Sequence, residues 1–265
     1  EVALRWWCAR GPGAVDDWRG MFAAAVWDPS SEELWLVRDH WGIKPLYYRA
    51  DGESLAFCSE VRGLLATGVA APRLSRRGIE DYLRYGAVQD PVTIIDGVYA
   101  LLPGHALRWS RGKFETWPYT APRLAAGSEA KALEPAAVGE MFGEIVRQQL
   151  IADVPVVVFL SGGVDSSVVA AAARRASPDV HTMAVVFEES RYSEREYARR
   201  VARRLGTKHH EALLEGGAVL EKAVEAISRM DQPTVDGINT YVVSEAARRE
   251  GFTVALSGLG GDEFF

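Results

Sequence analysis

Short apolar runs separated by turn-forming residues dominate the first 117 positions of the chain. Runs rich in aromatic and β-branched side chains predict strands at residues 21–28, 33–39, 45–50 and 54–60, with further short strands near 98–109. Asp51-Gly52 separates two of these runs and is typical of a β-hairpin turn. Helix-like patterns flank the strands at 2–10, 59–66 and 76–85. This part of the chain is therefore predicted to be mostly β-sheet with a few covering helices.

Beyond residue 134 the pattern changes to a regular alternation of strands and helices. Continuous apolar runs predict strands at 156–160, 181–187, 209–214 and 252–258. Between and before them, helices are predicted at about 135–150, 166–176, 193–206, 217–230 and 239–250. Ser193 with Glu196 forms a capping-box signature at the start of the third helix. Such alternation is typical of a parallel sheet with helices on both faces.

The two patterns are separated by a stretch that has neither periodicity. Residues 118–134, PYTAPRLAAGSEAKALE, are rich in Pro, Ala, Gly and Ser, as linkers are. We therefore expect one domain over residues 1–117, a linker over 118–134 and a second domain over 135–265.

Composition narrows the classes of function. A chain of 265 residues is long enough for two domains that each bury a core. The net charge of −6 argues against a general binder of nucleic acids or anionic membranes, which need an excess of Lys and Arg. No apolar run approaches the ~20 residues that cross a bilayer. Only Cys8 and Cys58 are present, so we expect buried thiols rather than disulfides, and a cytoplasmic protein.

The most informative polar stretch is SGGVDSS, residues 161–167, between a predicted strand and a predicted helix. Gly162 and Gly163 let a ligand approach the backbone, and the following helix start offers N–H groups to an anion. Asp165 is unsuited to binding an anion unless a cation such as Mg²⁺ lies between them. Neither a Walker lysine nor a GxGxxG pattern is present. Taken alone, a plain strand-to-helix turn explains this loop as well as a phosphate site does.

A second loop of the same kind favours the ligand site. LSGLGGDE, residues 256–263, again places Ser-Gly directly after an apolar strand, with Asp262 behind it. In a parallel sheet, ligands bind beyond the carboxyl ends of the strands, and both loops leave from such ends. Two carboxylates beside two glycine loops predict a magnesium–nucleotide site from which pyrophosphate leaves.

The first loop resembles the pyrophosphate-binding loop of the N-type ATP pyrophosphatases, and the chain as a whole resembles the glutamine-dependent asparagine synthetases. The matching segments, in the order of that family, are 19–28, 38–48, 57–65, 84–105, 153–167, 181–187, 206–211 and 256–263. This resemblance implies an α/β fold overall. Residues 1–117 would be part of an αββα glutaminase domain of the N-terminal-nucleophile (Ntn) type. A Rossmann-like, adenine nucleotide alpha hydrolase-like domain with a parallel sheet would follow.

The resemblance also implies roles for individual residues. ATP would be bound by Leu160, Ser161, Gly162, Gly163, Asp165, Ser166, Val185, Ser257 and Gly258. Mg²⁺ would be bound by Asp165 and Asp262. The implied reaction activates aspartate as β-aspartyl-AMP and amidates it with ammonia from glutamine, giving asparagine, AMP and pyrophosphate. The implied partners are these small molecules, and a homodimer is left open.

Three departures from the family pattern limit this interpretation. The chain begins at Glu1, so the N-terminal nucleophilic Cys is not in it and no glutaminase catalytic residue is assigned. It ends at Phe265 inside the second loop, so we expect an internal segment that is inactive alone. Leu259 stands where the family has Glu, and leucine cannot transfer a proton. The acceptor is therefore open, and a relative of the β-lactam synthetase or lasso-peptide cyclase type is the alternative, as is a nucleotide-binding module without turnover.

Other polar groups are interpreted as structural. Adjacent residues on a strand point to opposite faces, so His209-His210 is not expected to form one site. Arg38-Asp39-His40 is expected to set a turn, and the arginines between 199 and 204 to form a solvated helix face. The sequence leaves open whether residues 231–239, DQPTVDGIN, touch the acceptor or only connect two helices.

Overall fold

The fold was obtained as a computed structural model, which describes residues 1–120, 134–187, 194–214 and 219–261. The chain divides into two compact units. Unit 1 comprises residues 1–125 together with 230–235, and unit 2 comprises residues 126–229 together with 236–265. None of the helices in the described residues combines the length and apolar character that a bilayer crossing requires.

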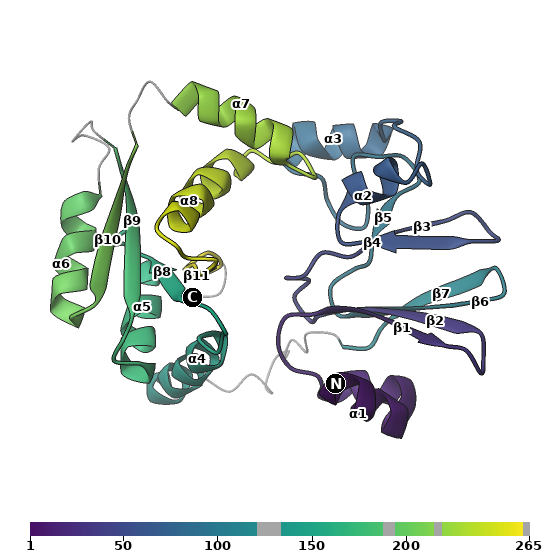
Figure 1. The fold of residues 1–265 in the computed structure, drawn as a ribbon, viewed down its shortest axis with the longest axis horizontal. Helices are drawn as coiled ribbons and strands as arrows, with labels where there is room; N and C mark the ends of the chain where they lie inside the picture. Colours follow the sequence, from purple (N-terminus) through teal and green to yellow (C-terminus); the bar gives the residue numbers. More distant parts are fainter. Residues whose placement is uncertain (121–133, 188–193, 215–218, 262–265) are drawn as a thin grey trace. The chain divides into compact units, whose positions relative to one another are not determined.

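Unit 1 has four layers, two antiparallel sheets enclosed by helices (Figure 1). One sheet has the order β1 (Ala23–Asp28), β2 (Glu33–Arg38), β6 (His105–Ser110), β7 (Lys113–Pro118). The other has the order β4 (Leu55–Cys58), β3 (Tyr47–Ala50), β5 (Tyr99–Ala100). The helices are α1 (Val2–Arg10), the 3₁₀ helix η1 (Gly11–Asp17), α2 (Val61–Ala66) and α3 (Arg76–Tyr85). This αββα arrangement agrees with the predicted glutaminase fold class.

The strict alternation of side chains along the strands creates these layers. Leu36 and Leu107 are fully buried between the sheets, in a core that they share with Tyr48 of β3. Their neighbours Val37 and Ala106 point to the opposite face and pack against α1 and η1. Successive strand residues face opposite sides, so a single apolar run contributes to two cores.

A buried carboxylate organises the turn after β2, as expected for the Arg38-Asp39-His40 triplet. The side chain of Asp39 is 1% exposed. It accepts hydrogen bonds from the backbone N–H groups of Phe22 (3.3 Å), Trp41 (3.1 Å), Ile43 (3.0 Å) and Lys44 (2.9 Å). These four bonds satisfy the carboxylate and fix the loop backbone.

The adjacent guanidinium completes this turn. Arg38 donates to the carbonyl oxygens of Lys44 (3.0 Å), Gly42 (2.8 Å) and Leu101 (2.6 Å). It also forms an ion pair with Asp90 at 2.8 Å. The prediction that the triplet sets a turn is confirmed, and the turn joins segments up to 63 residues apart.

Unit 2 contains one parallel sheet of order β10 (Lys208–Leu214), β9 (His181–Phe187), β8 (Val156–Phe159), β11 (Val254–Leu256). Its helices are α4 (Pro135–Gln149), α5 (Val164–Ala176), α6 (Arg195–Leu205), α7 (Val219–Arg229) and α8 (Gly237–Arg249). The predicted alternation and the predicted parallel sheet are both confirmed.

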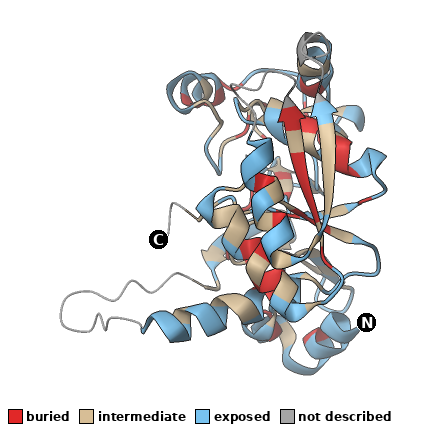
Figure 2. Cartoon of the chain, turned by 90° about the vertical axis from the view of Figure 1, so that its left-hand side faces the viewer, coloured by how far each residue is buried: buried red, intermediate tan, exposed pale blue. Residues whose placement is uncertain are grey.

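Helices cover both faces of this sheet. On one face, Val158 packs in a core with residues of α4, α5 and α6, and on the other, Val157 packs with residues of α8. Figure 2 shows buried residues on the strands and on the inward sides of the helices, and exposed residues on the outward sides. Because β8 is covered on both faces, its residues are apolar without alternation, whereas the edge strand β10 carries polar residues at positions 208–211.

The structure departs from the sequence predictions in several places. Strand β7 was not predicted; its last residue, Pro118, pairs with His105, and Tyr119 N–H donates to Gly104 O at 3.0 Å. The first residues assigned to the linker therefore pack in unit 1. Cys8 is exposed on α1, against the expectation of a buried thiol. Helix α6 begins at Arg195 after an N-cap residue without a side-chain cap, and Ser193 lies outside the described residues.

Replacing Asp39 with Asn is expected to destabilise the fold, because the amide group turns a donor toward backbone N–H groups and leaves them unsatisfied. A buried unsatisfied group costs about 1–3 kcal/mol, so the free energy of unfolding should fall by about 2 kcal/mol or more. Denaturant unfolding followed by tryptophan fluorescence measures this. Asp51→Asn is the control, because Asp51 also accepts from turn N–H groups but is exposed. Equal losses in both variants would contradict the role given to the buried carboxylate.

Candidate functional site

The two glycine loops leave the same edge of the sheet in unit 2. Strands β8 and β11 are parallel neighbours, with Leu256 paired to Val158. The first loop starts three residues after Val158, and the second starts directly after Leu256. Parallel pairing therefore brings residues 161–167 and 257–261 together, although about ninety residues separate them in the sequence.

The first loop requires glycine at position 162. Gly162 has φ +90°, a region that residues with a side chain rarely adopt. A Cβ at this position would lie 2.6 Å from Cβ of Tyr197 and 2.7 Å from the backbone N of Ala198. The first turn of α6 therefore packs directly on the loop backbone. Any larger residue at 162 would displace the loop or the helix.

The serines of this loop hydrogen-bond within it and shape the start of α5. Ser166 Oγ lies 3.0 Å from Ser161 Oγ, and Ser167 Oγ donates to Gly163 O at 2.6 Å. Gly163 is the N-cap residue of α5. The first N–H groups of a helix have no acceptor within it, so those of α5 remain available to an anion.

The second loop approaches the first closely enough to exclude side chains from two positions. A Cβ on Gly258 would lie 2.8 Å from the backbone N of Ser166, and a Cβ on Gly261 would lie 2.6 Å from Cγ of Asp165. Sequence reasoning assigned Gly258 to the site and missed Gly261. The repeated glycines after an apolar strand were the available signal for it.

Asp165 stands where the two loops meet. It lies in the first turn of α5 and is half-buried, and no hydrogen bond or ion pair holds its carboxylate within the described parts of the chain. Over the same residues no three His, Cys, Asp or Glu side chains cluster as metal ligands, and Asp262 lies outside them. The free carboxylate oxygens beside a helix start fit a divalent cation bound together with phosphate groups.

The remaining predicted ATP-site residues lie at or near this edge in different environments. The Leu160 side chain is buried in the core and its N–H donates to Met183 O at 2.8 Å, so both groups are used within the fold. Val185 is half-buried on β9, beyond the end of β8. Ser257 is exposed, and its Oγ accepts from the N–H of Leu259, whose side chain is 91% exposed.

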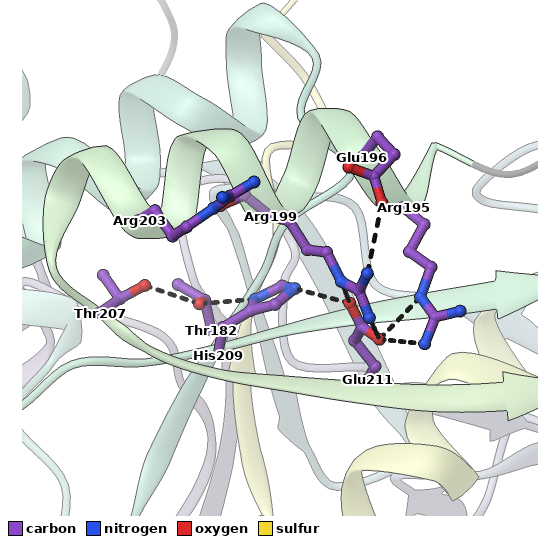
Figure 3. A network of polar contacts seen from close by, with 8 residues as sticks. All are labelled: Thr182, Arg195, Glu196, Arg199, Arg203, Thr207, His209 and Glu211. Atoms are coloured by element: carbon purple, nitrogen blue, oxygen red, sulfur yellow. Dashed lines mark hydrogen bonds and ion pairs between the residues drawn. The ribbon is translucent and has the colours of Figure 1, made fainter.

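A polar cavity of about 740 Å³ lies between α6 and the first part of β10, and Figure 3 shows the network of polar side chains at this place. Arg195 and Arg199 both hydrogen-bond to the Glu211 carboxylate, at 2.8 and 2.9 Å to Oε2. Burial opposes ionisation of Glu211, but these hydrogen bonds outweigh it and lower its pKa. The charges of this cavity are thus largely paired with one another. Contrary to the sequence prediction, Arg199 is not merely part of a solvated face, because it fastens α6 to the edge strand.

The two adjacent histidines of β10 have separate partners, as predicted. His209 Nδ1 lies 3.0 Å from Thr182 Oγ1, whereas His210 Nε2 lies 2.9 Å from His181 Nδ1 on the other face. Burial lowers the pKa of His209, which keeps its ring neutral near pH 7. The lining of the cavity carries no surplus charge for an ionic ligand, so the loop edge is the better candidate site.

The sequence profile of the asparagine synthase family matches residues 137–265, and that of the glutamine amidotransferase domain matches residues 1–120. The glutamine-hydrolysing asparagine synthetase 3 of Bacillus subtilis is 29% identical over 282 residues, covering 100% of this chain and 46% of the relative. Asparagine synthetase 1 of the same organism is 29% identical over 257 residues, covering 95% of this chain and 40% of that relative.

A relative that is named an amidase aligns over a similar length of this chain. An amidase of Gibberella zeae is 30% identical over 289 residues, covering 100% of this chain and 42% of the amidase. The chain thus spans less than half the length of each of these three curated relatives. The two profiles nonetheless match consecutive parts that together cover almost every residue of the chain. Over its two consecutive parts, the chain is thus similar to the glutamine amidotransferase domain and to the asparagine synthase family.

Proposed function

We propose that the full-length protein is a glutamine-hydrolysing asparagine synthetase. It would activate aspartate as β-aspartyl-AMP with ATP and transfer ammonia from glutamine, releasing asparagine, AMP and pyrophosphate. The similarity to these two families supports glutamine-dependent amide synthesis. The observation that carries the ATP-dependent step is the contact of two glycine loops at neighbouring strand ends, with the free carboxylate of Asp165 between them.

The proposed nucleotide site uses backbone groups more than side chains. The N–H groups at the start of α5 and the hydroxyls of Ser161 and Ser166 would bind the β- and γ-phosphates. Val185 would pack against the adenosine, and Ser257 with Gly258 would border the AMP part. Mg²⁺, held by Asp165 and Asp262, would supply positive charge to the departing pyrophosphate.

In the proposed first step, an aspartate side-chain oxygen attacks the α-phosphorus and the bond to the bridging oxygen of pyrophosphate breaks. Negative charge develops on that bridging oxygen. The N–H groups of α5 are already oriented toward the loop edge, so they can stabilise this charge without reorganisation. Ammonia then attacks the acyl carbon of the adenylate and AMP leaves. The chain's contribution is chiefly positioning and electrostatic stabilisation.

The acceptor and the ammonia supply depend on groups other than the two glycine loops. Leu259 is fully apolar, so it cannot orient an amine by hydrogen bonding or accept its proton. The group that orients the amine and accepts its proton would have to come from another residue or from the substrate itself. The match of residues 1–120 to the glutamine amidotransferase domain supports glutamine as the nitrogen donor. We place the activity in the cytoplasm, a reducing compartment that suits two free cysteines.

Exchange of labelled pyrophosphate into ATP tests the adenylation step directly. The full-length protein should catalyse this exchange when aspartate is present, because the adenylate forms reversibly before ammonia is needed. Glutamate and other carboxylic acids should give little exchange. Exchange with another acid and none with aspartate would replace asparagine synthesis by a related ligase reaction. No exchange with any acid, alongside ATP binding, would favour a nucleotide-binding module without turnover.

Asp165→Asn is expected to lower kcat/KM for this exchange by about 100-fold or more, because a metal ion contributes several kcal/mol of charge stabilisation. Raising the Mg²⁺ concentration should recover part of the loss. Asp153→Asn is the matched control, since Asp153 is an exposed aspartate at the opposite end of β8. Unchanged exchange in Asp165→Asn would remove this carboxylate from the metal site.

Gly258→Ala is expected to separate the two loops, because the new methyl group would lie 2.8 Å from the backbone N of Ser166. The KM for ATP in the exchange should rise by about 10-fold or more, equivalent to about 1.4 kcal/mol of lost binding. Gly143→Ala in α4 is the control, because a Cβ there meets nothing within 4 Å. It should leave KM unchanged and stabilise the helix by up to about 1 kcal/mol. Equal KM values for the two variants would contradict a functional contact between the loops.

A further inference from the structure

Residues 230–235 belong to unit 1, although they lie between α7 and α8 of unit 2 in the sequence. Sequence analysis left open whether this segment touches the acceptor. In the structure, Asp231 of this segment binds to unit 1. The Asp231 carboxylate accepts hydrogen bonds from the backbone N–H groups of Val61 at 2.7 Å and Arg62 at 2.9 Å.

Asp231 therefore caps the N-terminus of α2. The residue that precedes this helix, Glu60, makes no side-chain capping bond. A carboxylate at this position satisfies two N–H groups that the helix leaves free, and it interacts favourably with the helix dipole. Its side chain is only 19% exposed, and Arg62 lies at 3.5 Å as a further partner. The cap comes from 170 residues away along the chain.

Two more attachments hold the same segment to unit 1. Gln232 Oε1 accepts from the N–H of Ile94 at 2.9 Å. Val235 N–H donates to Gly86 O at 2.9 Å, at the residue that ends α3. Gly86 has φ +73°, and a Cβ there would lie 3.0 Å from a Val235 methyl group. The segment thus completes the start of α2 and the end of α3 with directed bonds.

This attachment constrains the chain on either side of it. Helix α8 begins at Gly237, two residues after Val235, and leads through β11 to the Ser257-Gly258 loop. Helix α7 ends at Arg229, two residues before Asp231. A short segment with several fixed bonds transmits displacement to the helices that continue from it, whereas an unattached loop would absorb that displacement.

We propose that Asp231 is a positioning residue for glutamine-dependent amide transfer. By capping α2, its carboxylate fixes the α7–α8 connection to the amidotransferase-like unit, so that nitrogen transfer from glutamine depends on this bond. Synthesis from free ammonia does not depend on it. This inference rests on the proposed function, and it assigns to residues 231–235 a role apart from acceptor binding.

The experiment uses full-length Asp231→Asn and Asp231→Ala, with Asp96→Asn as the control for loss of a carboxylate from unit 1. Asp96 makes an ion pair with Arg73, and their side chains are 45% and 78% exposed. Amide hydrogen exchange at Val61 and Arg62 reports the cap without requiring activity. Asparagine formation is then measured with glutamine and separately with saturating ammonium, together with glutamate released per asparagine.

In both Asp231 variants we expect exchange at Val61 and Arg62 to accelerate by about 10-fold or more. Glutamine-dependent synthesis should fall by about 10-fold with excess glutamate released, whereas ammonia-dependent synthesis should stay within about 2-fold. Asp96→Asn should change none of these. The conservative Asp231→Asn keeps the test interpretable if Asp231→Ala fails to fold.

Three results would overturn the proposal. Asp231 would be a purely stabilising cap if glutamine-dependent and ammonia-dependent synthesis fell in parallel. The same would hold if exchange at Val61 and Arg62 accelerated while glutamate released per asparagine stayed unchanged. Unchanged protection at Val61 and Arg62 would refute the cap itself. If the unaltered protein made no asparagine from either nitrogen source, the proposed function would fail, whereas the exchange measurement would still decide the cap.

Discussion

The parallel pairing of β8 with β11 is the constraint on which the candidate site depends. It brings together two loops that about ninety residues separate in the sequence, and it points both toward the same edge of the sheet. The approach is so close that Gly258 and Gly261 have no room for a side chain. A single glycine loop after a strand is a common turn, whereas two such loops in contact beside the first N–H groups of a helix are typical of an anion site.

The carboxylate of Asp165 at that edge differs from other carboxylates of the described residues in its hydrogen-bond partners. Asp39 and Glu211 are carboxylates whose hydrogen bonds are supplied by the protein, in one case by backbone N–H groups and in the other by two arginines. Such groups stabilise a turn or fasten a helix. Asp165 has no comparable partner in the described residues. This difference is the basis of the metal-binding role that we propose for Asp165.

Two helices of unit 1 depend for their end groups on residues far along the chain, which the sequence of residues 1–125 does not reveal. Asp231 reaches α2 and Val235 reaches the end of α3 from a segment far along the chain. Domain limits drawn from composition alone would leave both helix ends incomplete. Residues 230–235 belong to unit 1, but they are covalently continuous with α7 and α8 of unit 2. This continuity is the basis for expecting a functional dependence of one unit on the other.

The sequence by itself determined the layer types, because alternating and continuous apolar runs each permit one kind of sheet. It also determined the first loop, since Gly162 and Ser161 are neighbours on the chain and local rules describe them. Only the tertiary structure decided the contact of Gly261 with Asp165, the pairing of Arg199 with Glu211 and the cap from Asp231. Each of these joins residues through packing between distant elements, and no local periodicity encodes such a distance.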